Sequence, residues 1–336
     1  MVQRLDAKKI LGQNSIWLVL IALCAFMAVY SPHFLTPVNI TNLLTTEAIK
    51  GIVTVGVMFC ILSKGIDLST GSVVALSSVV SASLVQEIHA HNKIIEGMYP
   101  LSPYVALLAG LTVGLLVGLF NGALIAYTKI PAFIATLGTM LIARALAQLY
   151  TLAQPVAVLT PEFTVLGRGM NFGLDAPNFL PNIPNVVLIF LIVLGIGAFM
   201  LNRTRYGKNV YAIGGNDMAA RVAGINVEFT LVKVYAFSGL CAGLAGVLLA
   251  ARTVTGHSVH GTGLELDAIA AATVGGVSHS GGIGRISSVF AGILVLGVVS
   301  NGLLILGVSP YLQNVVRGGI IIGAVAFDMR KHAKRA

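Results

Sequence analysis

Residues 104–127 read YVALLAGLTVGLLVGLFNGALIAY, and this stretch decides the fold because it holds no charged side chain. A helix needs about 20 consecutive, mostly apolar residues to cross the hydrocarbon core of a bilayer. The stretch is long enough to do so, and it therefore predicts a transmembrane helix.

Apolar runs of this kind cover nearly the whole chain. Mean hydropathy is +0.90 and 10% of the residues are charged, whereas a soluble domain carries about 25%. Such a chain could not cover a water-facing surface, so we expect one membrane domain over residues 1–336. The predicted spans are about 16–30, 46–63, 70–86, 104–127, 131–150, 187–201, 231–251, 266–278, 286–306 and 312–327.

The distribution of Lys and Arg orients these spans. With the N-terminus in the cytoplasm, 15 of the 21 cationic residues fall in cytoplasmic segments and 2 within spans, as the positive-inside rule requires. The outer segments hold the other four, which are Lys50, Lys93, Arg168 and Arg252. An even number of spans returns the C-terminus to the cytoplasm. No small-residue cleavage site follows the span at 16–30, which predicts an uncleaved helix and not a signal peptide.

Two stretches resemble each other and suggest an internal repeat. Phe120-Asn121-Gly122 leads to Pro131, and Ser300-Asn301-Gly302 leads to Pro310. Upstream, the segments 67–69 and 265–267 each open a short span. The topology inverts the copies relative to the membrane, which is common in transporters; chance similarity between Gly-rich apolar stretches is the alternative. The expected fold is all-α and integral to the membrane, with about ten transmembrane helices in two inverted-topology repeats (about 46–150 and 231–327) and both termini cytoplasmic.

The longest cytoplasmic loop, about residues 202–230, carries helix signals of its own. Asn216 or Asp217 can accept hydrogen bonds as an N-cap, and Gly224 suits the left-handed position after a helix. Met218 and Val222 would then share one side of a short helix outside the membrane. Such an element fits a partner's groove, although a solvated loop with one helical turn is the alternative.

Polar groups within and near the spans are candidates for lining a transport pathway. They could hydrogen-bond a polyhydroxylated solute, cap helices or tie helices together. Arg144 and Arg317 fall within spans and are functional candidates unless they reach an interface. The pathway candidates are Asp67, Ser69, Asn121, Thr136, Thr139, Glu265, Asp267 and Asn301.

The sequence excludes several other classes of function. The net charge of +9 does not indicate nucleic-acid binding, because the cations lie between apolar runs and not along one face. No G-x-x-x-x-G-K-[ST] motif is present, so no ATP site of that kind is expected. The histidines and three cysteines lack the spacing of a metal site, and no nucleophile–base–orienter set is evident. We expect no catalytic site, metal site or cofactor in this chain.

Several motifs together resemble one known family. They are Gly65-Ile66-Asp67-Leu68-Ser69, Asn121-Gly122-x-Leu124-Ile125, Pro131-x-Phe133-Ile134-x-Thr136-Leu137-Gly138-Thr139-Met140, Tyr211-Ala212-Ile213-Gly214-Gly215-Asn216, Gly224-Ile225-Asn226-Val227, Glu265-Leu266-Asp267-Ala268-Ile269-Ala270-Ala271, Val274-Gly275-Gly276-Val277-Ser278 and Gly281-Gly282-x-Gly284. The chain resembles, over essentially its whole length, the inner-membrane permease subunits of bacterial ABC sugar importers of the ribose, galactose and xylose type.

The resemblance implies partners and a substrate class. A homodimer, or a pair of like permeases, would sit on two cytoplasmic ATPase subunits that bind ATP and Mg, and a periplasmic sugar-binding protein would feed it. Residues around 86–101 and 121–140 look most like galactose/methyl-galactoside permeases, and the turn at 255–263 leans towards the ribose branch. The ATPase-coupling residues that it implies are Gly214, Gly215, Asn216, Asp217, Ala220, Arg221, Gly224 and Asn226.

Two alternatives of another class stay open. An ion-coupled secondary transporter or channel would favour paired buried carboxylates or a histidine relay in mid-span, and the sequence makes none evident. A membrane enzyme would need a catalytic constellation, which the sequence does not supply.

Overall fold

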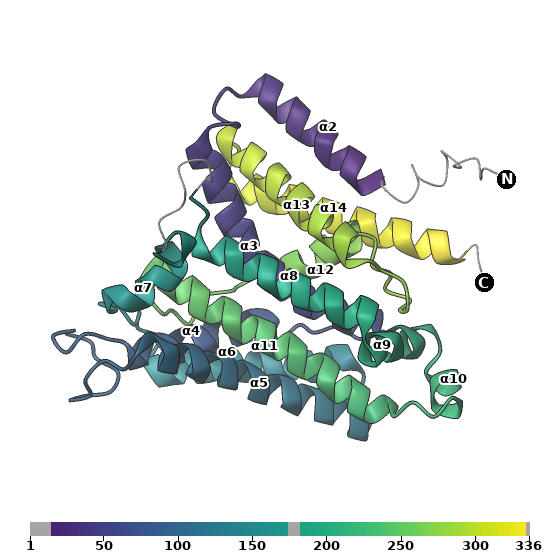
Figure 1. Ribbon diagram of the computed structural model, residues 1–336, viewed down its shortest axis with the longest axis horizontal. Coiled ribbons are helices and arrows are strands. Elements are labelled where there is room, and N and C mark those ends of the chain that lie inside the picture. The colour runs from purple at the N-terminus through teal and green to yellow at the C-terminus, as the bar shows by residue number, and fades with distance from the viewer. Residues whose placement is uncertain (1–14, 174–181, 334–336) are drawn as a thin grey trace.

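The computed structural model describes residues 15–173 and 182–333. Within these ranges the secondary structure is helical, and the helices lie side by side in one bundle (Figure 1). The elements are α2 (Ser15–Tyr30), α3 (Pro37–Leu62), α4 (Thr70–Leu84), α5 (Pro103–Thr128), α6 (Ala132–Thr151), α7 (Pro161–Arg168), the 3-10 turn η1 (Asn171–Gly173), α8 (Asn185–Arg203), α9 (Arg205–Gly215), α10 (Asp217–Val222), α11 (Val227–Thr253), α12 (Leu264–Val274), α13 (Ile286–Ile305) and α14 (Pro310–Ala333).

Length and composition identify the helices that can cross a membrane. Among the described residues, six helices qualify: α3, α5, α6, α8, α11 and α13. The helices α2 and α4 are apolar but shorter. The predicted all-helical membrane fold is confirmed, while the number of ten crossings stays a prediction.

Local capping places the start of α3 well before the predicted span at 46–63. The Thr36 side chain accepts a hydrogen bond from the Asn39 N–H, and Pro37 occupies the first turn, where it costs no helical hydrogen bond. Polar residues lower the hydropathy of this part of the chain without breaking the helix. Glu47 and Lys50 therefore lie inside α3 and not in an external segment.

The core of the bundle lies around α3 and α11, which contact each other. In the most apolar 18-residue window, 83% of α3 and 78% of α11 are buried, compared with 22% of α5. The protein itself therefore shields α3 and α11, whereas α5 keeps most of its apolar surface free for lipid or for a partner.

Two sets of four consecutive helices pack in the same way. In the set α3–α6, α4 contacts α5 and α6; in the set α11–α14, α12 contacts α13 and α14. The first helix of each set crosses to the other set, so that α3 packs on α12 and α13, and α11 packs on α4 and α5. Each short helix is thereby held between helices from both sets.

Small residues bring α5 and α11 into backbone contact. A Cβ on Gly114 would lie 2.8 Å from the Gly243 Cα, and a Cβ on Gly239 would lie 2.8 Å from the Gly118 Cα. Such close approach is typical of helix pairs in membranes, where small residues let backbones pack tightly.

The two ends of the bundle carry different elements. Helices α9 and α10 project at one end, and α7 lies at the opposite end with the irregular segment 85–102 (Figure 1). The start of α2 and the end of α14 lie towards the α9–α10 end (Figure 1). The segment 85–102 falls between the predicted spans at 70–86 and 104–127, whereas α7 and α9 were not predicted.

Candidate functional site

A polar cavity lies where the first half of α3 meets α12, α13 and α14. Its inner part has a volume of about 20 Å³, which is room for about one water molecule. An adjoining part near the start of α3 and the end of α13 has about 200 Å³. Glu47, Lys50, Ser300 and Gln313 line both parts, so we treat the two parts as one site, the α3–α14 cavity.

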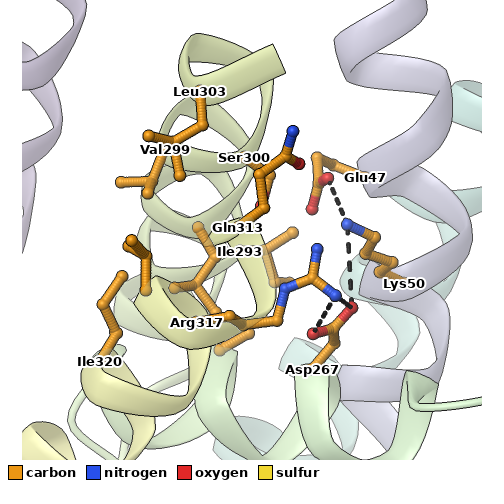
Figure 2. A pocket seen from close by; sticks show the side chains of 13 residues that line it. Glu47, Lys50, Asp267, Ile293, Val299, Ser300, Leu303, Gln313, Arg317 and Ile320 are labelled. Atoms are coloured by element: carbon orange, nitrogen blue, oxygen red, sulfur yellow. Dashed lines mark hydrogen bonds and ion pairs between the residues drawn. The ribbon is translucent and has the colours of Figure 1, made fainter. Parts of the chain in front are cut away.

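Four charged side chains from three helices meet in this cavity (Figure 2). The Lys50 Nζ lies 2.8 Å from the Glu47 Oε1 and 3.9 Å from the Asp267 Oδ2. The Arg317 NH1 lies 3.3 Å from each carboxylate oxygen of Asp267. Two carboxylates thus face two cations, which offsets the cost of removing these charges from water.

Amide and hydroxyl groups surround the outer part of the cavity. The Asn39 and Asn301 side chains exchange two hydrogen bonds, at 3.0 and 2.8 Å, and thereby join α3 to α13. Beside them, Arg252 NH2 donates to the Thr46 Oγ1 at 3.0 Å. The cavity therefore presents both donors and acceptors, which a polyhydroxylated solute requires.

A second polar network lies in the segment 63–69, between α3 and α4, and is closed. The Asp67 Oδ1 accepts from the Ser69 N–H at 3.0 Å and from the Ser69 Oγ at 2.6 Å. The Asp67 Oδ2 accepts from the Ser238 Oγ of α11 at 2.7 Å, and the Asn121 Nδ2 of α5 donates to the Ser69 Oγ at 2.9 Å. All four residues are at most 1% exposed, so a solute could reach them only after a rearrangement.

Thr136 fixes the same segment to α6. Its Oγ1 lies 3.1 Å from both the Leu68 N and the Ile66 O, close enough to bond each. The Thr139 hydroxyl instead donates to the Ala135 carbonyl of its own helix at 3.0 Å. Of the predicted pathway residues, the structure thus brings Asp67, Ser69 and Asn121 into direct contact and leaves Thr139 apart.

The segment 254–263, which leads into α12, is anchored by different groups. Arg144 of α6 donates to the carbonyls of Ser258 and His260 at 2.5 and 2.8 Å. The His260 Nδ1 lies 2.8 Å from the Ser78 Oγ of α4. Burial lowers the pKa of His260 to about 4, and the nearby His257 and Arg144 act in the same direction, so this imidazole is neutral at pH 7.

Glu265 lies at the start of α12 and does not join the α3–α14 cavity. Its carboxylate rests against Gly71 at the start of α4. Its Oε2 is buried and has no hydrogen-bond partner among the described residues. The two carboxylates of the 265–267 segment therefore point to different surroundings, with Asp267 in the cavity and Glu265 between α4 and α12.

The predicted helix in the 202–230 loop is present as α10, with the predicted caps. The Asn216 Oδ1 accepts from the Ala219 N–H at 3.0 Å. At the other end Gly224 has a φ of +81°, and the Ile225 N–H donates to the Ala220 carbonyl at 3.0 Å, which is the pattern of a Schellman motif. Asn226 then caps α11 by accepting from the Phe229 N–H at 2.9 Å.

One side of α10 packs on the bundle and the other is free. Ala220 is buried in a cluster with Ile213 and Val227, whereas Met218 and Val222 are 67% and 90% exposed. These two side chains are four positions apart and form an exposed apolar side of α10. Arg221 is held beside it by an ion pair with Glu228 at 2.6 Å.

Sequence reasoning missed two members of the cavity, Glu47 and Lys50. The sequence did indicate them, because placing two ionisable residues three positions apart inside an apolar helix costs free energy, and such residues usually serve a function. This indication was overlooked because Lys50 was counted with the external cations. Within the described ranges no group of three or more His, Cys, Asp or Glu residues is placed to hold a metal ion.

Comparison with known proteins gives a consistent set of relatives. A family model described as "Branched-chain amino acid transport system / permease component" matches residues 39–325. The galactose/methyl galactoside import permease protein MglC of Salmonella typhimurium is 37% identical over 97% of this chain and 96% of its own length. The ribose import permease protein RbsC of Escherichia coli K12 is 38% identical over 98% and 97%. The L-arabinose transport system permease protein AraH of the same strain is 39% identical over 96% and 92%. No solved structure matches the chain.

Proposed function

We propose that this chain, which belongs to the family of transport-system permease components, is the membrane-spanning subunit of an ATP-driven importer for a monosaccharide. The observation that carries the proposal is identity of 37 to 39% with three sugar permeases over at least 96% of this chain. The chain is a multi-pass protein of the bacterial inner membrane.

The substrate class follows from what the relatives have in common. Their names give galactose or methyl galactoside, ribose and L-arabinose, which are all neutral and polyhydroxylated. The description of the family names branched-chain amino acids, but the sugar permeases match nearly the whole chain. The amide, hydroxyl and charged groups of the α3–α14 cavity suit hydroxyl groups, and galactose and ribose are the first candidates.

The energy source and the partners belong to the same proposal. The chain has no P-loop, so a separate cytoplasmic ATPase subunit would bind ATP and Mg and hydrolyse the nucleotide. The exposed Met218–Val222 side of α10 would dock into that subunit. A periplasmic sugar-binding protein would deliver the substrate, and a second copy of the permease would complete the complex.

The membrane topology is proposed on the packing described above. The sets α3–α6 and α11–α14 have matching neighbours, which supports two inverted repeats within about ten spans. The start of α2 and the end of α14 lie at the α9–α10 end of the bundle (Figure 1), which supports a common cytoplasmic side for the termini and the docking helix.

Reconstitution tests the function directly. The chain would be co-purified with its ATPase and sugar-binding protein and placed in liposomes that contain ATP on the ATPase side. We expect uptake of galactose, ribose or L-arabinose that requires ATP hydrolysis and the binding protein. Uptake that continues without ATP and stops when an ionophore collapses the ion gradients would instead establish an ion-coupled transporter. Glu47 and Asp267 of the α3–α14 cavity would then be the natural coupling groups.

A further inference from the structure

Three segments of backbone contact one another at the end of α9, with the Lys64 side chain beside them. They are the end of α3 at Leu62, the end of α9 at Gly214, and the turn at Gly281–Gly282 between α12 and α13. The Gly282 N–H donates to the Leu62 carbonyl at 2.9 Å, and a Cβ on Gly281 would lie 3.0 Å from the Gly214 Cα. We name this place the glycine junction.

Gly214 fits the glycine junction only because it has no side chain. A Cβ at this position would overlap the Leu62 carbonyl oxygen and the Gly282 amide nitrogen. The next residue, Gly215, has nothing within 4 Å of the corresponding position. The contact is therefore specific to Gly214 and does not reflect a general richness in glycine.

Further bonds fix α9 to both sides of the junction. The Tyr211 hydroxyl donates to the Gly284 carbonyl at 2.9 Å, and the Lys64 Nζ donates to the Gly215 carbonyl at 3.3 Å. Because α10 packs on Ile213 of α9, α10 is connected through α9 to the end of α3 and to the segment that leads into α13.

The junction continues directly into the closed network of Asp67. Leu62 ends α3, and the next residues form the segment 63–69. That segment is bonded to α5 through Asn121, to α6 through Thr136 and to α11 through Ser238. Direct contacts thus connect Gly214 to helices of both sets.

We propose that Gly214 is the positioning residue that transmits movement of the docking helix to the membrane helices. Backbone packed on backbone has no side-chain rotamers that could absorb a shift, and close-packed contacts transmit strain. The inference rests on the proposed function, because it assumes that an ATPase moves α10. Enlarging Gly214 by one methyl group separates α9 from α3 and from the 281–282 turn, and thereby uncouples ATP hydrolysis from sugar movement.

The test uses the complete importer in liposomes and measures sugar taken up per ATP hydrolysed. For Gly214→Ala we expect this ratio to fall by about tenfold or more, within the usual range of coupling between distant sites, while the ATPase still co-purifies. Gly215→Ala should lower the ratio less. The control is Gly195→Ala in α8, where a Cβ also meets open space and the ratio should stay at the wild-type value.

A failure of the proposed function and a failure of the role proposed for Gly214 give different results. A wild-type complex without ATP-dependent uptake would defeat the proposed function before any variant is made. A working wild type and an assembled Gly214→Ala complex with an unchanged ratio would overturn the inference alone. If Gly214→Ala does not assemble, Tyr211→Phe decides, because it removes only the bond to Gly284. A ratio lowered about fivefold, at the lower end of the coupling range, supports the junction. An unchanged ratio overturns it.

Discussion

The segment around Asp67 and the segment around Asp267 occupy similar places and have opposite character. Asp67 precedes α4 and contacts α11, while Asp267 lies in the first turn of α12 and contacts α3. Asp67 is 1% exposed and bonded to hydroxyl groups, whereas Asp267 is paired with cations and lines the inner part of the α3–α14 cavity.

Helices that pack in the same way in the two sets thus surround the two carboxylates differently. Both sets of helices hold a short helix between long ones, and both place a carboxylate beside it. In the first set every contact of the carboxylate is internal, so the segment 63–69 acts as a joint. In the second set the carboxylate pairs with cations in the wall of the α3–α14 cavity, so the solute is expected there.

Removal of the Asp67 carboxylate should have the largest effect on stability. Asp67→Leu leaves the hydroxyls of Ser69 and Ser238 without their acceptor in a fully buried place. We expect a loss of about 3 kcal/mol, since each buried donor left without an acceptor costs about 1 to 3 kcal/mol. Thermal unfolding of the detergent-solubilised chain measures it. If Asp67→Leu unfolds at the wild-type temperature, the network is not a joint.

Replacement of Asp267 by Asn should affect transport more than stability, and Asp67→Asn is its matched control. Asp267→Asn weakens the pairing with Lys50 and Arg317, but the amide oxygen can still accept a hydrogen bond from Arg317, and the side chains of both cations are partly exposed, at 21% and 32%. We therefore expect near-normal unfolding together with clearly reduced uptake in liposomes. The comparison fails if Asp267→Asn destabilises the chain more than Asp67→Asn does while uptake per folded molecule stays normal.

Acidification should weaken the contact between His260 and Ser78 that anchors the 254–263 segment. The hydrogen bonds of the 63–69 segment to hydroxyl groups should remain. His260 has a pKa of about 4 in the folded chain and about 6.5 when unfolded. Between these values the unfolded chain binds more protons, so the stability that His260 contributes is present above pH 6.5 and is lost as the pH falls towards 4. Unfolding temperatures of the wild type and of His260→Gln, compared from pH 7 to pH 4, should converge on acidification. A difference in unfolding temperature between the two chains that stays constant with pH would contradict this role of His260.

The amide pair between α3 and α13 should show the smallest effect. Asn301→Leu removes two hydrogen bonds to Asn39, and side-chain hydrogen bonds between membrane helices contribute about 0.6 kcal/mol on average. The double variant with Asn39→Leu should recover part of the loss, since no buried amide is then left unpaired. A double variant less stable than the sum of the two single changes would show that the pair is not the relevant contact.

Local signals allowed α10 to be predicted from the sequence. Its caps depend on Asn216 and on Gly224 with its positive φ, and both act within a few residues. Apolar runs likewise predicted the six long helices, because burial in lipid requires composition and not specific contacts. The adjoining α9 escaped prediction because its short, mixed sequence is stabilised by the junction with Leu62 and Gly282.

Contacts between distant residues could not be predicted in the same way. Asp267 lies far along the chain from Lys50, and Ser238 far from Asp67, so only the crossing of α3 and α11 between the two sets brings them together. The sequence did single out Asp67, Ser69, Asn121, Asp267 and Asn301 as polar groups of interest. It could not assign them to a closed joint or to an open cavity, because that difference arises from packing.

Accessibility to a thiol reagent tests the central difference most directly. Ser69→Cys and Ser300→Cys would be made in a chain carrying Cys24→Ala, because Cys60 and Cys241 are buried. Intact cells would be treated with a membrane-impermeant maleimide. The account predicts that Ser300→Cys, which lines the α3–α14 cavity, is labelled from outside, whereas Ser69→Cys reacts only after denaturation. Equal labelling of both positions, or labelling of Ser69→Cys alone, would contradict it.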